Sequence, residues 1–291
     1  MTAIKAFIER HSVPTYFALT FVISWGGILI VVGPGGIPGT REEFERLLPV
    51  VILAMLAGPS VAGILLTGLV HGRTAFRELL SQLLKWQVSA RWYAFALLTA
   101  PLLFTAIPLA LSLLFPEFLP GIFTTDDKAS LLLLGIAAGL GAGIFEELGW
   151  TGFAIPRLRL QYGVLTTGLI VGFLWGAWHF LVNFWSSGRD SPSGALSLAL
   201  LLTSLLFSIG ILPAYRVLMV WVYDRTGSLL VAMLMHLSLT ASNVILAPLA
   251  TGVLPVIWVL VLAVALWIIV AVVAVVNRGQ LLQQPLPRQV A

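Results

Sequence analysis

Residues 254–277 read LPVIWVLVLAVALWIIVAVVAVVN, a continuous apolar run without one charged side chain. The uncharged stretch begins further upstream, because no Lys, Arg, Asp or Glu lies between Thr226 and Asn277. An apolar run of about 18 residues or more is long enough for a helix to cross the hydrocarbon core of a bilayer. Backbone groups in lipid must satisfy one another within the segment, so such runs form helices. This stretch therefore predicts an all-α membrane protein.

The same pattern recurs along the rest of the chain. The sequence is 59% hydrophobic and 10% charged, with a mean hydropathy of +1.02. We expect eight spans, at about 15–33, 48–70, 92–115, 129–155, 162–184, 194–223, 228–248 and 254–277. The fourth and sixth are long enough to tilt, kink or extend into the cytosol. Together they occupy the chain, so we expect one membrane domain over residues 1–291, a polytopic transmembrane helical bundle.

The basic residues indicate an orientation for these spans. With an even number of spans, both termini lie on one side of the membrane. That side has Lys5, Arg10, Arg73, Arg77, Lys85, Arg91, Arg157, Arg159, Arg216, Arg225, Arg278 and Arg288, and the other has Arg41, Arg46, Lys128 and Arg189. Because Lys and Arg favour cytoplasmic loops, we predict that both termini are cytoplasmic. The expected location is a bacterial plasma (inner) membrane, as a multi-pass protein.

Composition also excludes several functions. The absence of cysteine rules out disulfides, thiol catalysis and thiolate metal sites. The net charge of +4 is spread over membrane loops, so we expect contact with the lipid bilayer and not with nucleic acid. No internal repeat is visible, which argues against a transporter built from inverted repeats.

Two adjacent carboxylates, Glu146 and Glu147, lie inside the fourth span. The other ten of the 12 acidic residues lie in the N-terminal arm or in polar connections. A charged side chain at membrane depth costs at least about 2.5 kcal/mol, and two adjacent carboxylates also repel each other. Packing does not explain such a cost, so we interpret the pair as the working site.

A glycine stripe leads to this pair. Gly135, Gly139 and Gly143 repeat every four residues, a pattern that lets another helix approach closely. Glu147 continues the stripe, so we expect it at a helix interface. Glu146 lies about 100° around the helix and is expected to face a cavity.

Three further ionisable side chains are expected at membrane depth: His179 in the fifth span, Arg216 in the sixth and His236 in the seventh. At about 1.5 Å per residue, the depths of Glu146, His179 and His236 agree within roughly a third of a bilayer. The three side chains can therefore meet in one cavity open to the cytosol. A buried carboxylate can act as a base, one histidine can share a water with it, and a second histidine can stabilise an oxyanion.

Each of these residues also has a purely structural interpretation. A single membrane histidine often does no more than donate a hydrogen bond between helices. The glutamate pair can form an ion pair with Arg216, or Arg216 can extend to the cytosolic surface instead. We expect Trp150 and Trp175 to pack or to line the cavity. The whole combination favours a catalytic site.

At these residues the chain resembles the CPBP family of intramembrane proteases, which includes CAAX prenyl endopeptidases and bacteriocin-processing enzymes (type II CAAX protease-like). The family's first motif is Glu-Glu-x-x-x-Arg followed by Gly and an aromatic residue, and it corresponds to residues 146–153. The second, an aromatic residue four positions before His, corresponds to residues 175–179. The third, His followed at the fourth position by Asn, corresponds to residues 236–240. The resemblance covers about 130–245, a protease-like core.

The resemblance implies an intramembrane endopeptidase that hydrolyses a peptide or membrane-associated protein substrate; prenylated CAAX proteins are one substrate class of the family. It implies that Glu146 and His179 activate the attacking water. Glu147 would support them, and His236 with a neighbouring polar group would stabilise the oxyanion.

The family has been described both as metal-dependent and as glutamate proteases without a catalytic metal. We favour no cofactor and no metal. The alternative is zinc held by Glu146, His179 and His236, although the chain lacks the HExxH spacing, in which two histidines share a helical face.

Two positions depart from the family pattern. Thr151 replaces the motif arginine, which leaves Glu147 without its expected partner, and we expect Arg216 to take that place. Thr240 replaces the motif asparagine, with Asn243 three residues later, so we expect a Thr240 hydroxyl near the oxyanion. Asn243 lies about 10 Å further along the helix axis than His236, too far for the same oxygen.

Two other functions remain open on the sequence alone. The first is a catalytically inactive membrane scaffold of the same fold, which would bind partners without turnover. The second is a proton-coupled transporter that uses the buried Glu and His residues as a relay. A transporter requires a water path across the bilayer, whereas a protease requires a cavity closed at one end.

Overall fold

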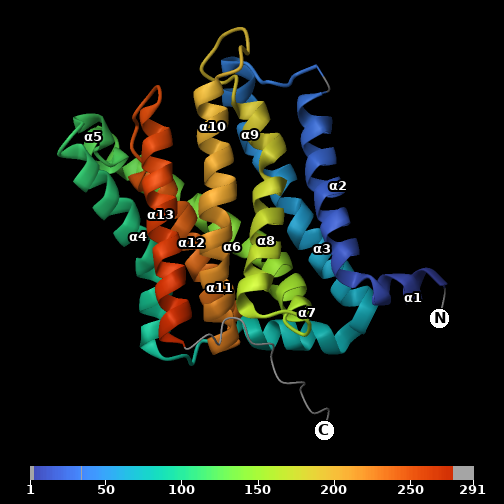
Figure 1. The fold of residues 1–291 in the computed structure, drawn as a ribbon. Helices are drawn as coiled ribbons and strands as arrows, with labels where there is room; N and C mark the ends of the chain where they lie inside the picture. The colour runs from blue at the N-terminus through green and yellow to red at the C-terminus, as the bar shows by residue number, and fades with distance from the viewer. Residues whose placement is uncertain (1–2, 34, 278–291) are drawn as a thin grey trace.

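The structure, a computed structural model, describes residues 3–33 and 35–277 (Figure 1). Its elements are α1 (Ala3–Arg10), α2 (Ser12–Val32), α3 (Arg41–Leu83), α4 (Ala90–Ser112), η1 (Pro116–Phe118), α5 (Gly121–Thr124), α6 (Lys128–Gly149), η2 (Trp150–Ala154), α7 (Ile155–Leu158), α8 (Val164–Trp178), α9 (Phe180–Ser186), α10 (Leu198–Leu206), η3 (Phe207–Ile211), α11 (Leu212–Thr226), α12 (Leu229–Leu246) and α13 (Leu254–Val276). No strand forms within these ranges, so the all-α prediction is confirmed.

Eight helical segments of the described chain are long and apolar enough to cross a membrane, which confirms the predicted polytopic bundle. They are Ser12–Val32, Arg41–Val70, Ala90–Ser112, Lys128–Leu158, Val164–Ser186, Leu198–Thr226, Leu229–Leu246 and Leu254–Val276. Each overlaps one predicted span. The start of α1 and the end of α13 lie at the same end of the bundle (Figure 1). That this end is cytoplasmic stays a prediction, and Arg278 and Arg288 lie outside the described residues.

The two longest predicted spans are interrupted by short π-helical turns. The span that carries the glutamate pair passes through η2 directly after α6, and the span that carries Arg216 passes through η3 directly before α11. One extra residue per turn rotates the side chains that follow, and such turns often accompany functional sites. Both long spans therefore change their helical pitch locally beside the candidate site.

The connection expected around Arg73 and Arg77 is helical instead. Helix α3 continues through it with a break at Gly72, whose φ of 62° is accessible to glycine at little cost. The remainder of α3 runs along the end of the bundle where the chain starts (Figure 1). This part of α3 exposes Phe76 and Leu80, which lie one helical turn apart on the same face. Apolar residues at this spacing are typical of an amphipathic helix at a surface.

The predicted glycine stripe of α6 packs against α12. A Cβ added at Gly139 would lie 2.7 Å from the carbonyl oxygen of Leu237, and one added at Gly143 would lie 2.7 Å from that of Met233. Only glycine permits this approach, so the stripe fixes α12, and with it His236, against α6.

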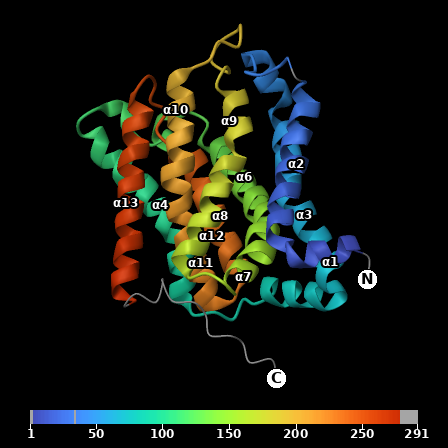
Figure 2. The same ribbon diagram turned by 45° about the vertical axis from the view of Figure 1, so that its right-hand side comes forward.

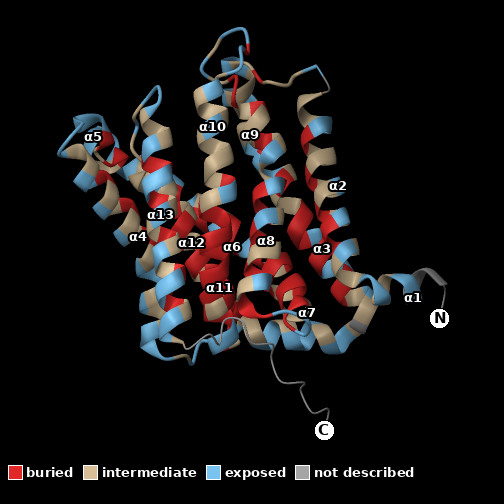
Figure 3. Cartoon of the chain, viewed as in Figure 1, coloured by how far each residue is buried: buried red, intermediate tan, exposed pale blue. Residues whose placement is uncertain are grey.

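A second stripe in α8 brings α11 equally close. A Cβ at Gly168 would lie 2.6 Å from the Cα of Val217, and one at Gly172 would lie 2.5 Å from the Cα of Pro213. This approach places Arg216 of α11 beside α8. Buried residues concentrate on α6, α8, α11 and α12, mostly in the half of the bundle near the termini (Figure 3).

Candidate active site

Glu147 is completely buried and is surrounded by donors from three elements. Arg216 Nη1 donates to both carboxylate oxygens, at 2.9 Å to Oε1 and 2.8 Å to Oε2. The Thr151 hydroxyl in η2 also donates to Oε2. His236 Nδ1 donates to Oε1 at 2.6 Å. Glu147 is therefore a fully satisfied buried anion with no acceptor position left for a substrate.

The predicted ion pair between Arg216 and one of the two glutamates is confirmed, and Glu147 is the partner. Arg216 is completely buried, so the alternative of a side chain that extends to the cytosolic surface is wrong. Its guanidinium carbon lies 4.1 Å from the Trp175 ring centroid, a cation–π contact. Thr151 is also a partner of Glu147, so the departure from the family motif does not leave the carboxylate unpaired.

Glu146 has a different environment, although its side chain is also buried, with 3% exposed. Oε2 accepts hydrogen bonds from two indoles, at 2.7 Å from Trp175 Nε1 and 3.3 Å from Trp150 Nε1. Oε1 lies 3.9 Å from His236 Nε2, beyond hydrogen-bonding distance. One oxygen is thus fixed by donors, while the other faces a histidine across a short gap.

The two tryptophans are therefore more than packing residues. The sequence contains a signal for one of them, because Trp150 follows Glu146 by four residues, as Thr151 follows Glu147. Side chains four residues apart on a helix lie on the same face and can bond. Trp175 comes from another helix, and no local spacing predicts its bond to Glu146.

His179 lies between α8 and α9, where the helical hydrogen bonding shifts by one residue. Its Nδ1 donates to the carbonyl of Trp175 at 2.9 Å, so Nε2 carries the lone pair in the neutral ring. Its ring packs against Trp175 and Trp178, with centroids 5.9 and 4.9 Å away. Within the described residues, no hydrogen bond or ion pair joins His179 directly to Glu146.

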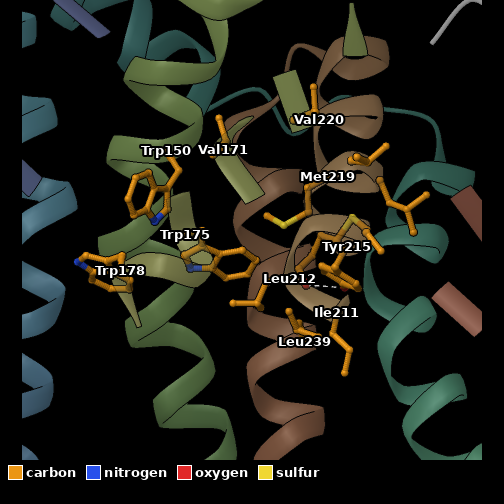
Figure 4. Packing of buried hydrophobic residues seen from close by; sticks show 14 of the residues in the cluster. Trp150, Val171, Trp175, Trp178, Ile211, Leu212, Tyr215, Met219, Val220 and Leu239 are labelled. Carbon is orange, nitrogen blue, oxygen red and sulfur yellow. Dashed lines mark hydrogen bonds between the residues drawn. The ribbon is translucent and has the colours of Figure 1, made fainter. Parts of the chain in front are cut away.

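Trp175 connects the whole candidate site. It bonds Glu146 through its indole N–H and His179 through its carbonyl, and it lies 4.9 Å from the His236 ring centroid. Figure 4 shows Trp175 between the Trp150 and Trp178 indoles and the apolar side chains of α11. The predicted convergence of Glu146, His179 and His236 is therefore organised around one indole.

Thr240 and Asn243 are less tightly connected to the site. They lie one and two turns beyond His236 in α12, and both are half-buried. In the described chain no hydrogen bond joins either side chain to the glutamates or to the histidines. Their supporting roles stay predictions.

The zinc alternative has an incomplete ligand set. Among residues 3–33 and 35–277, no group of three or more His, Asp or Glu side chains is placed to hold one metal ion. Glu146 Oε1 and His236 Nε2 lie 3.9 Å apart and offer two ligand atoms at most. Catalytic zinc sites use three protein ligands, so the arrangement does not fit a zinc ion.

Comparison with known proteins agrees with the motifs. Residues 128–242 match the family described as Rce1-like type II CAAX prenyl endopeptidase. A protein from Methanococcus maripaludis named CAAX prenyl protease 2 is 23% identical over 251 residues, which cover 82% of this chain and 86% of that protein. The predicted resemblance to type II CAAX proteases is therefore confirmed. It supports a membrane endopeptidase, in agreement with the eight apolar helices.

Proposed function

We propose that this protein hydrolyses peptide bonds within the membrane, and that Glu146 and His179 activate the attacking water. One observation carries the proposal. Glu146 is a buried carboxylate with one oxygen fixed by two indoles and the other left toward His236. Glu147, one residue later, is fully engaged by Arg216, Thr151 and His236. The environments divide the pair into a reacting and a supporting carboxylate.

The proposed base is shared by Glu146 and His179. His179 Nε2 is the acceptor nitrogen, because Nδ1 donates to the Trp175 carbonyl. Trp175 also donates to Glu146, so one residue orients both groups. A water held between Glu146 Oε1 and His179 Nε2 would lose its proton to this pair as it attacks the peptide carbonyl.

His236 is the proposed oxyanion donor. Its Nδ1 is fixed by Glu147, which directs Nε2 toward Glu146. The 3.9 Å between His236 Nε2 and Glu146 Oε1 is too long for a hydrogen bond, yet it allows both atoms to lie about 2.8 Å from one reacting oxygen. Donation from Nε2 requires the doubly protonated ring, whose positive charge lies beside both carboxylates.

Glu147 and Arg216 act through His236 in this scheme. Arg216 holds Glu147 with two hydrogen bonds, and Glu147 in turn fixes the tautomer and the angle of the His236 ring. Glu147 is a positioning residue, because Oε1 and Oε2 already accept from Arg216, Thr151 and His236, and Arg216 acts through Glu147.

The proposed substrates are membrane-associated peptides, including C-terminal segments of the CAAX type. The name of the Methanococcus maripaludis relative and the match over residues 128–242 support this class. The buried position of Glu146 also supports it, since a substrate must enter the helical bundle to reach the carboxylate.

A cleavage assay tests the proposal against an inactive scaffold. The purified protein in nanodiscs is incubated with a set of membrane-associated peptides, and products are identified by mass spectrometry. Glu146→Gln and His179→Gln should each lower the cleavage rate by about 10²–10⁴-fold, while Glu45→Gln at an exposed carboxylate should not change it. Cleavage retained in both site variants would refute the assignment, and binding without turnover in the unsubstituted protein would favour a scaffold.

A further inference from the structure

Residues 73–83, the part of α3 that follows the break at Gly72, form a surface helix at the end of the bundle where the chain starts. Figure 2 shows this segment running across that end, crosswise to the spanning helices. The apolar spanning segment of α3 ends at Val70, so the break lies directly beyond it. A helix that turns away at this level lies along the membrane surface, where lipid headgroups meet water.

One side of the surface helix is fixed to the bundle. Leu79 packs against η2, since a Cβ added at Gly152 would lie 2.7 Å from Leu79 Cδ1. The Tyr223 hydroxyl at the end of α11 donates to Gln82 Oε1 at 2.9 Å. Glu78, the one acidic residue of the segment, lies one helical turn before Gln82 on the same side. The bundle therefore sets the rotation of the surface helix about its own axis.

The opposite side carries an exposed apolar face with arginines on its flank. Phe76 and Leu80 are 39% and 53% exposed. Arg73 and Arg77 are exposed as well. At about 100° per residue, Arg73 lies within about 20° of Leu80 around the helix, and Arg77 lies about 60° from it. No ion pair engages either arginine in the part of the chain that the structure describes, so both guanidinium groups are available to a partner.

This apolar face continues the surface that the spanning part of α3 presents to lipid. Leu65 and Leu69 are exposed one turn apart near the end of the spanning segment. The Phe76 ring folds back onto the same region, since a Cβ added at Gly68 would lie 3.3 Å from Phe76 Cε2. The lipid-facing surface therefore extends around the break and onto the surface helix.

We propose that the face formed by Phe76, Leu80, Arg73 and Arg77 docks on the membrane surface and binds the phosphates of anionic lipid headgroups. The two apolar side chains enter the boundary of the acyl chains, and the two arginines lie at the level of the phosphates. Guanidinium groups bind phosphate oxygens through paired hydrogen bonds. Two cations without a carboxylate on their side of the helix favour an anionic lipid over a zwitterionic one.

Continuity with the spanning surface favours lipid over a soluble partner protein, because the same apolar side chains that would meet the protein already adjoin the hydrocarbon. This lipid contact goes beyond the proposed peptidase function and does not depend on it. Its tests measure the surroundings of the surface helix and not cleavage.

Spin labels on single cysteines test the docking, since the chain contains no cysteine of its own. Leu80→Cys and Ser81→Cys are a matched pair, because Ser81 is also exposed but lies about 100° around the helix. In nanodiscs with anionic lipid, the label at position 80 should be more accessible to oxygen, which concentrates in hydrocarbon. The label at position 81 should be more accessible to a water-soluble nickel complex.

Equal access of the nickel complex to both labels would overturn the docking. Shielding of the label at position 80 from both reagents, together with a doubled particle mass, would assign the face to a second copy of the chain and would overturn it as well.

Quenching of a fluorophore on Leu80→Cys measures which headgroup lies beside the face. Phosphatidylglycerol and phosphatidylcholine, each with the same quencher on the same acyl chain, are compared at equal mole fraction. Phosphatidylglycerol should be preferred, and Arg73→Gln and Arg77→Gln should each lower the preference about 5-fold, the contribution of one basic residue near an anionic surface. Lysine at either position should retain the preference, because the charge is kept.

The control is Arg41→Gln at the other end of α3, where Nη2 donates to the Asp190 carbonyl at 2.9 Å. This substitution should leave the preference unchanged. Equal quenching by the two lipids, or a preference that survives the double Gln variant, would overturn the assignment to anionic lipid. Loss of the preference in millimolar inorganic phosphate at constant ionic strength would assign the arginines to a soluble anion and overturn it too.

Discussion

Arg216 Nη1 lies 2.8 Å from Glu147 Oε2, although the two residues are 69 positions apart in the chain. Both side chains are completely buried, so the pair links α6 to α11 inside the bundle. Removal of one partner leaves an uncompensated charge in a medium that solvates it poorly. We therefore expect substitutions in this pair to lower the stability of the bundle strongly.

Arg216→Met should lower the free energy of unfolding by about 3–5 kcal/mol, because Glu147 loses its counter-charge. The double variant Arg216→Met with Glu147→Gln should recover part of that loss, since the buried charge disappears. Denaturant unfolding in mixed micelles measures both, with Arg91→Met as an exposed control. A double variant as unstable as the single one would show that packing of the long side chain, and not charge, explains the loss.

Thr151→Arg tests whether Arg216 stands in for the family arginine. Thr151 already donates to Glu147, so an arginine at this position can reach the same carboxylate once Arg216 is removed. While Arg216 is present, the larger side chain does not fit beside Glu147 without displacing its neighbours. We therefore expect Thr151→Arg alone to lower the free energy of unfolding by about 1–3 kcal/mol.

Combined with Arg216→Met, Thr151→Arg should restore stability, which corresponds to a favourable coupling of about 1–3 kcal/mol in a double-mutant cycle. Strictly additive losses in that cycle would mean that the two positions do not substitute for each other.

Trp175→Phe should reduce kcat while the bundle stays folded. The ring still packs between Arg216 and His236, but the 2.7 Å bond from Nε1 to Glu146 is lost. Loss of one hydrogen bond to a charged group costs about 1.5–3 kcal/mol, so we expect a decrease of about 10–100-fold. Trp258→Phe is the matched control, because the buried Trp258 Nε1 has no hydrogen-bond partner in the described chain. Equal effects of the two substitutions would show that the hydrogen bond from Trp175 to Glu146 does not contribute to catalysis.

Gly143→Ala tests the close approach of α6 and α12. Its Cβ would lie 2.7 Å from the Met233 carbonyl oxygen, so one helix must move and carry Glu146 and Glu147 away from His236. We expect a loss of about 1–3 kcal/mol in stability and a lower kcat. Gly141→Ala, in the same helix, would meet only Leu56 at 3.8 Å and should be neutral or stabilising. An unchanged stability and kcat in Gly143→Ala would show that α6 and α12 can separate to accept the added methyl group without loss of free energy.

The eight spans were predictable because insertion of a helix into a membrane depends on the mean hydropathy of about 20 consecutive residues. Packing against neighbouring helices changes this dependence little. The pairing of Arg216 with the glutamates followed from the cost of an unpaired charge at depth. The bond from Trp175 to Glu146 was not predictable, because it depends on how two helices pack and on the rotation that η2 introduces. The surface helix after Gly72 was missed because its charged residues resemble a loop.

Cleavage in H₂¹⁸O by the unsubstituted protein and by Glu146→Gln tests whether Glu146 activates the attacking water. We expect one ¹⁸O in the new C-terminal carboxylate of the product, and a rate about 10²–10⁴-fold lower in Glu146→Gln, as for loss of a general base. Peptide binding, measured on the same samples, should be unchanged. Cleavage by Glu146→Gln at the unsubstituted rate would exclude Glu146 as the base, and a product without ¹⁸O would exclude hydrolysis.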